Sequence, residues 1–167
     1  MVAFYKKLLN AEAGFESSRI AYPCFDGSIT ESLLALSQEL PTKIPTSAGL
    51  EHIAFGFHSL QDLALSYRQR KKLGIEPTWC VNHEITMSIY YEDPDGNHLE
   101  TQVDLFDNND KATDFILSKE FKDNPIGVDF DPEEFVRHLQ SGEDLASIKK
   151  RPEIGPRGTP VHLLNKH

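Results

Sequence analysis

Hydrophobic and polar residues alternate along residues 51–58, EHIAFGFH. Alternation with a period of two is typical of a β-strand, because successive side chains point to opposite faces. One face carries large apolar side chains, and the other carries small residues with an imidazole at each end. The two sets are Ile53, Phe55 and Phe57, and His52, Ala54, Gly56 and His58. The pattern predicts a strand with one face in the core and the other lining a hollow.

The same alternation returns along residues 97–104, NHLETQVD. One face carries Leu99, Thr101 and Val103, and the other carries His98, Glu100 and Gln102. Metal-ligating or hydrogen-bonding side chains therefore gather again on a single face, which predicts a second strand of the same kind.

A helix is predicted between these two strands. Ser59 is a good N-cap with Asp62 three residues later, and Gly74 fits the position just past a helix end. The apolar stripe consists of Leu60, Leu63, Ala64 and Tyr67.

Two more strands are predicted over residues 76–81 and 86–92, which are rich in β-branched and aromatic residues. The sequence DPDG at 93–96 is a strong turn signal. Residues 49–106 thus form one unit in the order strand, helix, strand, strand, hairpin, strand.

This order, with LEHIAF at its start and SIYYEDPDGNHLE near its end, resembles the βαβββ module of the vicinal oxygen chelate superfamily. That superfamily includes glyoxalase I, bleomycin-resistance proteins, fosfomycin-resistance enzymes and type I extradiol dioxygenases. The extradiol-dioxygenase-like branch is the most similar, since it carries a histidine shortly before the hairpin strand and a tyrosine on it. The resemblance implies that His52 and Glu100 bind a metal and that His83 and Tyr90 are catalytic.

Several assignments stay open on the residues alone. Periodicity does not choose between Tyr90 and Tyr91, which reach opposite faces. His58 and His98 are expected at the surface, and either is a candidate for the further metal ligand. Cys80 is expected to be a small buried hydrophobic residue.

The segment before residue 49 predicts an incomplete copy of the same module. Residues 1–10 are typical of an amphipathic helix, and residues 19–25 and 31–37 of two strands around Asp26-Gly27. In the resembling family, such a helix follows a strand that carries the first metal-ligating histidine, and that strand is expected to be missing here. We expect domain boundaries at 1–39, a proline-stiffened linker at 40–48, and the complete module at 49–106.

Residues 107–167 predict a tail of helices and extended segments. A helix is predicted over 111–118, an extended stretch over 121–128, and a helix that begins at Asp131-Pro132 and ends at Gly142. Residues 149–167 contain three prolines and two glycines, so no compact element is expected there.

The composition of the chain excludes some classes of function. The chain has 167 residues, 39% hydrophobic residues and a net charge of −9, which excludes a basic nucleic-acid-binding surface. No apolar run approaches a membrane span, and with two cysteines a disulfide framework is excluded. We expect a soluble, cytoplasmic protein without nucleic-acid or membrane partners.

The sequence therefore predicts an α+β protein with paired βαβββ modules, the first incomplete, which form a curved mixed sheet around a cleft. The first functional hypothesis is an extradiol-dioxygenase-like metal enzyme acting on an aromatic diol, with Fe(II), or alternatively Mn(II), as cofactor. The third protein ligand is unidentified; a partner chain in a homodimer, His58, His98 or water are the candidate sources. Two other hypotheses are a biosynthetic isomerase or cyclase and a small-molecule binding protein.

Overall fold

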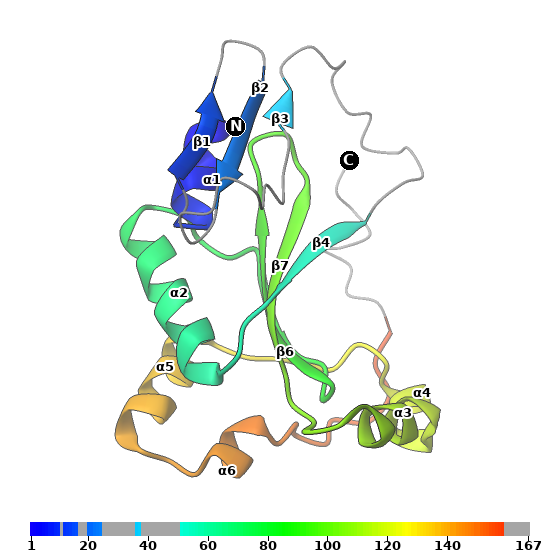
Figure 1. Cartoon of the computed structure of the whole chain (residues 1–167). Helices are drawn as coiled ribbons and strands as arrows, with labels where there is room; N and C mark the ends of the chain where they lie inside the picture. The colour runs from blue at the N-terminus through cyan, green and yellow to red at the C-terminus, as the bar shows by residue number, and fades with distance from the viewer. Residues whose placement is uncertain (11, 17–19, 25–35, 38–50, 159–167) are drawn as a thin grey trace.

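The computed structural model of the chain describes residues 1–10, 12–16, 20–24, 36–37 and 51–158 (Figure 1). Its elements are α1 (Val2–Leu8), β1 (Glu12–Glu16), β2 (Ile20–Cys24), β3 (Leu36–Ser37), β4 (His52–Gly56), α2 (Leu60–Lys72), β5 (Trp79–Asn82), β6 (Thr86–Glu92), β7 (His98–Asp104), α3 (Asn109–Leu117), α4 (Lys119–Asp123), β8 (Val128–Asp129), α5 (Pro132–Ser141) and α6 (Leu145–Lys149). No helix among the described residues is long and apolar enough to cross a membrane.

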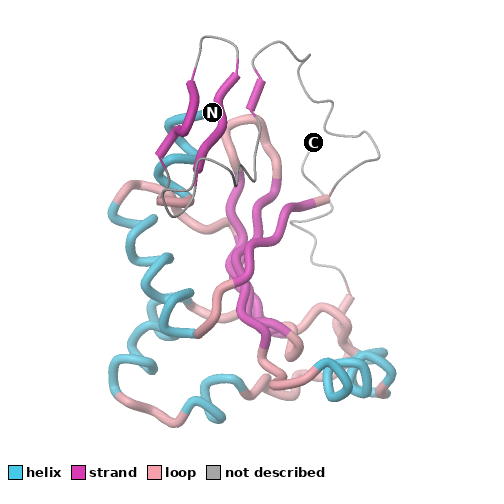
Figure 2. The backbone as a smooth tube through the Cα atoms, in the orientation of Figure 1, coloured by secondary structure: helices cyan, strands magenta, loops and turns pink. Residues whose placement is uncertain are grey.

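The larger sheet has the strand order β4-β7-β6-β5-β8. β4 runs parallel to β7, and the other neighbouring strands are antiparallel. Because α2 connects β4 to β5 and lies along one side of the sheet (Figure 2), the strand, helix and three strands follow in the predicted order. The prediction of an α+β fold with a curved mixed sheet is confirmed.

The smaller sheet has three antiparallel strands in the order β1-β2-β3 and follows α1. The helix predicted over 1–10 and the strand predicted over 19–25 are confirmed by α1 and β2. β1 was not predicted, because EAGFE offers only one large apolar side chain. The Asp26-Gly27 turn, most of the strand predicted over 31–37 and the linker at 40–48 lie outside the described residues. The division into two modules stays a prediction.

One face of the larger sheet forms the core. Leu99 pairs with Ile53 of β4 and with Tyr91 of β6, and both Leu99 and Tyr91 are fully buried. Helices α1, α2 and α5 cover this face with the buried side chains Tyr5, Leu8, Leu63, Tyr67, Phe135 and Val136. Burial of each large apolar side chain stabilises the fold by about 1.5–3 kcal/mol. The opposite face is therefore left to the polar residues of the alternating pattern.

The turn between β6 and β7 is organised by the buried Asp93. Its carboxylate accepts hydrogen bonds from the backbone N–H groups of Asp95 (2.9 Å) and Asn97 (2.8 Å) and from the hydroxyl of Tyr5 (2.7 Å). Gly96 adopts a φ of +78°, which glycine reaches without strain. This turn fixes the register of β6 on β7, which places Tyr90 opposite Glu100.

Replacing Asp93 with alanine is expected to lower the free energy of unfolding by about 3 kcal/mol, because a buried hydrogen-bond network is broken. The matched control is Asp95→Ala in the same turn, whose exposed side chain predicts a change within about 0.5 kcal/mol. Denaturant unfolding of both variants measures the difference. Equal destabilisation of the two would show that Asp93 does not organise the turn.

The described residues after β7 form four short helices and the strand β8. Asp131 caps α5 by accepting from the N–H of Glu133 (2.7 Å), Pro132 begins the helix, and Gly142 ends it at a φ of +76°, as predicted. The helix predicted over 111–118 is confirmed by α3. The extended stretch predicted over 121–128 is wrong in its first half, because Ser118 caps a second helix, α4, that continues to Asp123. There Asn124-Pro125 ends the helix rather than centring an extended segment.

Candidate active site

The polar face of the sheet aligns three side chains from neighbouring strands. Trp79 of β5 pairs with Tyr90 of β6, and Tyr90 pairs with Glu100 of β7. His52 lies on the adjacent strand β4, and its ring meets the ring of Tyr90 edge-on at 5.7 Å between centroids. The register answers the question left open by periodicity, because Tyr90 lies on this face and Tyr91 lies in the core.

His52 and Glu100 converge at this face. Nε2 of His52 lies 2.9 Å from Oε2 of Glu100. The Glu100 side chain is 5% exposed and that of His52 is 34% exposed, so the pair lies at the edge of the buried region. The two residues for which the family resemblance implied a shared metal are thus neighbours, although their assignment as ligands stays a prediction.

The second nitrogen of His52 is also occupied. Nδ1 donates to Oε2 of Glu51, whose other oxygen accepts from Nδ1 of His98 at 3.0 Å. Neutral imidazole carries only one N–H, yet both nitrogens of His52 face carboxylates. With Nδ1 donating to Glu51, the lone pair of Nε2 faces Oε2 of Glu100, and a cation held between these two atoms would be bound by both. A histidine oriented by a carboxylate on its far nitrogen is also the usual arrangement of a metal-ligating histidine.

The side chains of His52 and Glu100 supply part of the ligand set that a divalent metal needs. One imidazole nitrogen and one carboxylate oxygen are ligands that iron and manganese accept. Within the part of the chain that the structure describes, no group of three or more His, Cys, Asp and Glu side chains could hold a metal. His58 is exposed, as predicted, and His98 is partly buried against Glu51 and Glu92 rather than at Glu100.

His83 and Tyr90 form a second pair on this face. His83 directly follows β5, and its Nδ1 lies 2.6 Å from the carbonyl oxygen of Ile126. A carbonyl can only accept, so Nδ1 carries the hydrogen and Nε2 keeps its lone pair. Nε2 lies 3.2 Å from the hydroxyl of Tyr90, which can donate to it. This leaves an imidazole with a basic nitrogen facing the sheet.

The electrostatics keep this pair in useful protonation states. Burial lowers the pKa of His83 below its ordinary value of 6.5, which outweighs the opposite influence of the Glu100 charge. Burial, reinforced by Glu100, raises the pKa of Tyr90 above its ordinary value. At neutral pH the pair therefore offers an unprotonated imidazole and a protonated phenol, a base next to a hydrogen-bond donor.

Sequence reasoning missed Trp79, which contributes an aromatic wall. Its indole stacks on the ring of Tyr90 with centroids 5.0 Å apart and 26° between planes, and it meets His83 edge-on at 5.7 Å. The indole N–H donates to Oδ1 of Asp129 in β8 (2.7 Å). Trp79 is the chain's only tryptophan, which is a signal that could have marked it as a candidate site residue. Its contact with Tyr90, however, depends on the strand register.

Cys80 lies on the opposite face of β5, buried in the core as predicted. Burial, with Asp131 and Asp129 nearby, raises the pKa of its thiol to about 12. The thiol is therefore protonated at neutral pH and takes no part in this site.

Comparison with known proteins gives two relatives of one kind. The chain is 36% identical over 146 residues to biphenyl-2,3-diol 1,2-dioxygenase 2 of Rhodococcus globerulus, which covers 87% of this chain and 77% of the relative. It is 40% identical over 112 residues to biphenyl-2,3-diol 1,2-dioxygenase 3 of the same organism; this match covers 67% of the chain and 59% of that relative. No protein-family model matches the chain.

Among solved structures, the chain is similar to the fosfomycin resistance protein FosX of Listeria monocytogenes in complex with Mn(II) and sulfate. The TM-score is 0.50 at 20% identity, covering 67% of this chain and 85% of FosX. At this identity the likeness shows the fold alone.

Proposed function

Because the chain belongs to the vicinal oxygen chelate superfamily, in its extradiol-dioxygenase-like branch, we propose that it is a metal-dependent dioxygenase acting on an aromatic diol. The observation that carries the proposal is the convergence of His52 and Glu100 beside the His83–Tyr90 pair on one face of the sheet. The relatives act, by their names, on biphenyl-2,3-diol, so a biphenyl diol is the first substrate to test.

We propose Fe(II) as the cofactor, with Mn(II) as the alternative, held by His52 and Glu100. When bound, a divalent iron supplies Lewis acidity and electron transfer toward O2, which side chains alone do not provide. A third protein ligand is needed beyond the groups that the described residues bring together.

The chain's own residues supply proton transfer and orientation. His83 Nε2 takes a proton from a diol hydroxyl, since its lone pair faces the site and burial keeps the ring neutral. The Tyr90 hydroxyl, held protonated, donates a hydrogen bond to a substrate oxygen. The indole of Trp79 offers a flat apolar surface beside Tyr90 for an aromatic ring.

We also propose a homodimer. Within the described residues β4 pairs on one side only, with β7, and an open strand edge is a site for association. Light scattering of the purified protein is expected to give about twice the monomer mass of 18.9 kDa.

The experiment that tests the function is oxygen uptake with biphenyl-2,3-diol. Protein reconstituted anaerobically with Fe(II) is expected to consume O2 in proportion to the diol and to give a coloured ring-opened product. Zn(II)-loaded protein is the matched control and should consume none, because zinc has no redox chemistry. Turnover without O2 would favour an isomerase or cyclase instead, and diol binding without turnover would favour a binding protein.

A further inference from the structure

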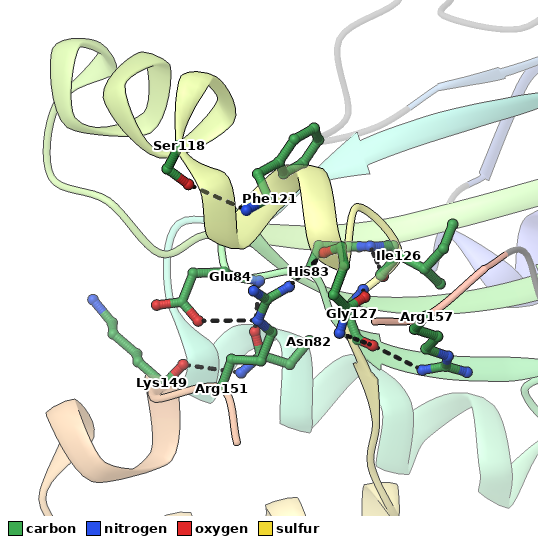
Figure 3. Close-up of polar contacts among 11 residues, drawn as sticks. Asn82, His83, Glu84, Ser118, Phe121, Ile126, Gly127, Lys149, Arg151 and Arg157 are labelled. Carbon is green, nitrogen blue, oxygen red and sulfur yellow. Dashed lines mark hydrogen bonds and ion pairs between the residues drawn. The ribbon is translucent and has the colours of Figure 1, made fainter. Parts of the chain in front are cut away.

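Residues 149–157 run alongside the backbone that carries His83 (Figure 3). They contact two segments there: the loop 82–84, which directly follows β5, and the turn 124–127, whose Ile126 carbonyl accepts from His83. The backbone carbonyl of Lys149 accepts from the side-chain amide of Asn82 at 2.9 Å. Three parts of the chain far apart in sequence thus meet around one imidazole.

Arg151 connects the loop to the turn. Its guanidinium lies 3.5 Å from the carboxylate of Glu84 and donates to the carbonyl of Asn124 at 3.0 Å. The Arg151 side chain is only 7% exposed, and it also lies over the ring of Phe115 at 5.3 Å. A buried guanidinium with fixed partners on both segments restricts their separation.

The loop that Arg151 holds has a strained backbone. Glu84 adopts a φ of +73°, a region that residues with a Cβ seldom occupy. Its N–H is held by the side-chain oxygen of Asn82 at 2.8 Å. Such a conformation costs about 1–3 kcal/mol and persists only where surrounding contacts enforce it. Lys149 and Arg151 supply contacts of this kind, next to the candidate base.

Arg157 fixes the other side of the turn. It donates to the carbonyl of Gly127 at 2.9 Å and, through its second terminal nitrogen, to both carboxylate oxygens of Asp129 at 2.8 and 2.9 Å. Gly127 packs so closely on the loop that a Cβ there would overlap the carbonyl of Asn82. Asp129 in turn accepts from Trp79, which stacks on Tyr90. Arg157 is thus linked to both members of the His83–Tyr90 pair.

We propose that residues 149–157 form a positioning strap for the His83–Tyr90 pair, with Arg151 and Arg157 as positioning residues. The strap sets the distance from the Ile126 carbonyl to His83, which selects the ring nitrogen that carries the hydrogen. It also holds the Asp129–Trp79 contact that supports Tyr90. The catalytic consequence rests on the proposed function, whereas the effect on the imidazole does not.

The first readout is the tautomer of His83, measured by long-range proton–nitrogen NMR on protein supplemented with diamagnetic Zn(II). In the wild-type protein Nδ1 should give the signal of a protonated nitrogen and Nε2 that of an unprotonated one. The His83 signals, among those of seven histidines, are assigned by their loss in His83→Gln. In Arg157→Ala the two nitrogen shifts are expected to move toward each other, because both tautomers become populated.

The second readout is steady-state turnover. Arg157→Ala and Arg151→Ala are expected to lower kcat at least about tenfold with little change in KM or metal content, since small displacements of a catalytic group are costly. Arg157→Lys should recover part of this loss, because the single nitrogen of lysine can reach the Gly127 carbonyl or Asp129 but does not offer a separate donor to each, as the guanidinium does. The control is Arg137→Ala, whose exposed side chain pairs with Glu134 on the same helix.

The outcomes separate the two proposals. Unchanged His83 signals in folded Arg157→Ala would overturn the strap, whatever the enzyme does. Absence of dioxygenase activity in the wild-type protein would overturn the proposed function and leave the tautomer measurement intact. If Arg151→Ala fails to fold, Arg157→Gln, at a position with 18% exposed side chain, takes its place and carries the same expectation.

Discussion

Replacing His83 with glutamine is expected to lower kcat for the aromatic diol by about 10²–10⁴-fold, the usual contribution of a general acid–base group. Glutamine can still hydrogen-bond with Tyr90 and the Ile126 carbonyl but cannot take up a proton, so the site keeps its shape and loses its base. Steady-state kinetics with parallel metal analysis make the measurement. Metal content should be unchanged, since His83 is not one of the two proposed ligands, His52 and Glu100.

The pH profile adds a signature to this prediction. Because burial lowers the pKa of His83, the wild-type imidazole stays neutral to more acidic pH than an exposed histidine. Activity should therefore fall on the acid side only below the ordinary histidine value of 6.5, and His83→Gln should lose that limb. His138→Gln, on the exposed face of α5, is the matched control with wild-type kinetics. A His83→Gln variant with wild-type kcat would remove His83 from the mechanism.

Replacing Glu100 with glutamine is expected to weaken Fe(II) binding more than about 100-fold, beyond the 10–100-fold typical of partners that only orient a ligand. The amide keeps the shape of the side chain but removes the negative charge that faces Nε2 of His52. His52→Ala should have an equal effect, because each residue supplies one donor. Anaerobic titration with Fe(II), followed by metal analysis of the desalted protein, makes the measurement.

Two further glutamate variants serve as comparisons in the same Fe(II) titration. Glu51→Gln should weaken binding by about 10–100-fold, because Glu51 only orients His52 through its far nitrogen. Glu92→Gln, an exposed residue at the end of β6, should leave Fe(II) binding unchanged. If Glu100→Gln bound Fe(II) as tightly as Glu92→Gln, the metal would lie elsewhere and the assignment of His52 and Glu100 would be wrong.

The central unit was predictable because its signals are local. The alternation along β4 and β7 follows from a face that must be buried, and the Ser59 cap, Gly74 and the DPDG turn each have a direct physical reason. These signals fix which residues share a face. They predict that His52 and Glu100 lie on the polar face of the sheet, and this prediction does not require the strand pairing to be known.

The surroundings of the site were not predictable, since they depend on register and on contacts distant in sequence. Trp79 meets Tyr90 only because β5 and β6 pair in one register, which alternation within a single strand does not encode. Arg151 and Arg157 lie in a segment expected to have no compact element, and its described residues 150–158 form no helix or strand. Their contribution comes from hydrogen bonds to backbone carbonyls of other segments, for which single-sequence patterns hold no signal.

The most direct test of the account is the fate of isotopically labelled O2. Fe(II)-loaded protein is given biphenyl-2,3-diol under ¹⁸O2, and the ring-opened product is analysed by mass spectrometry. The account predicts a product that carries both oxygen atoms of one O2 molecule, formed by the wild-type protein and lost in Glu100→Gln and His83→Gln. A product that forms without label, or one that forms equally in these variants, would contradict it.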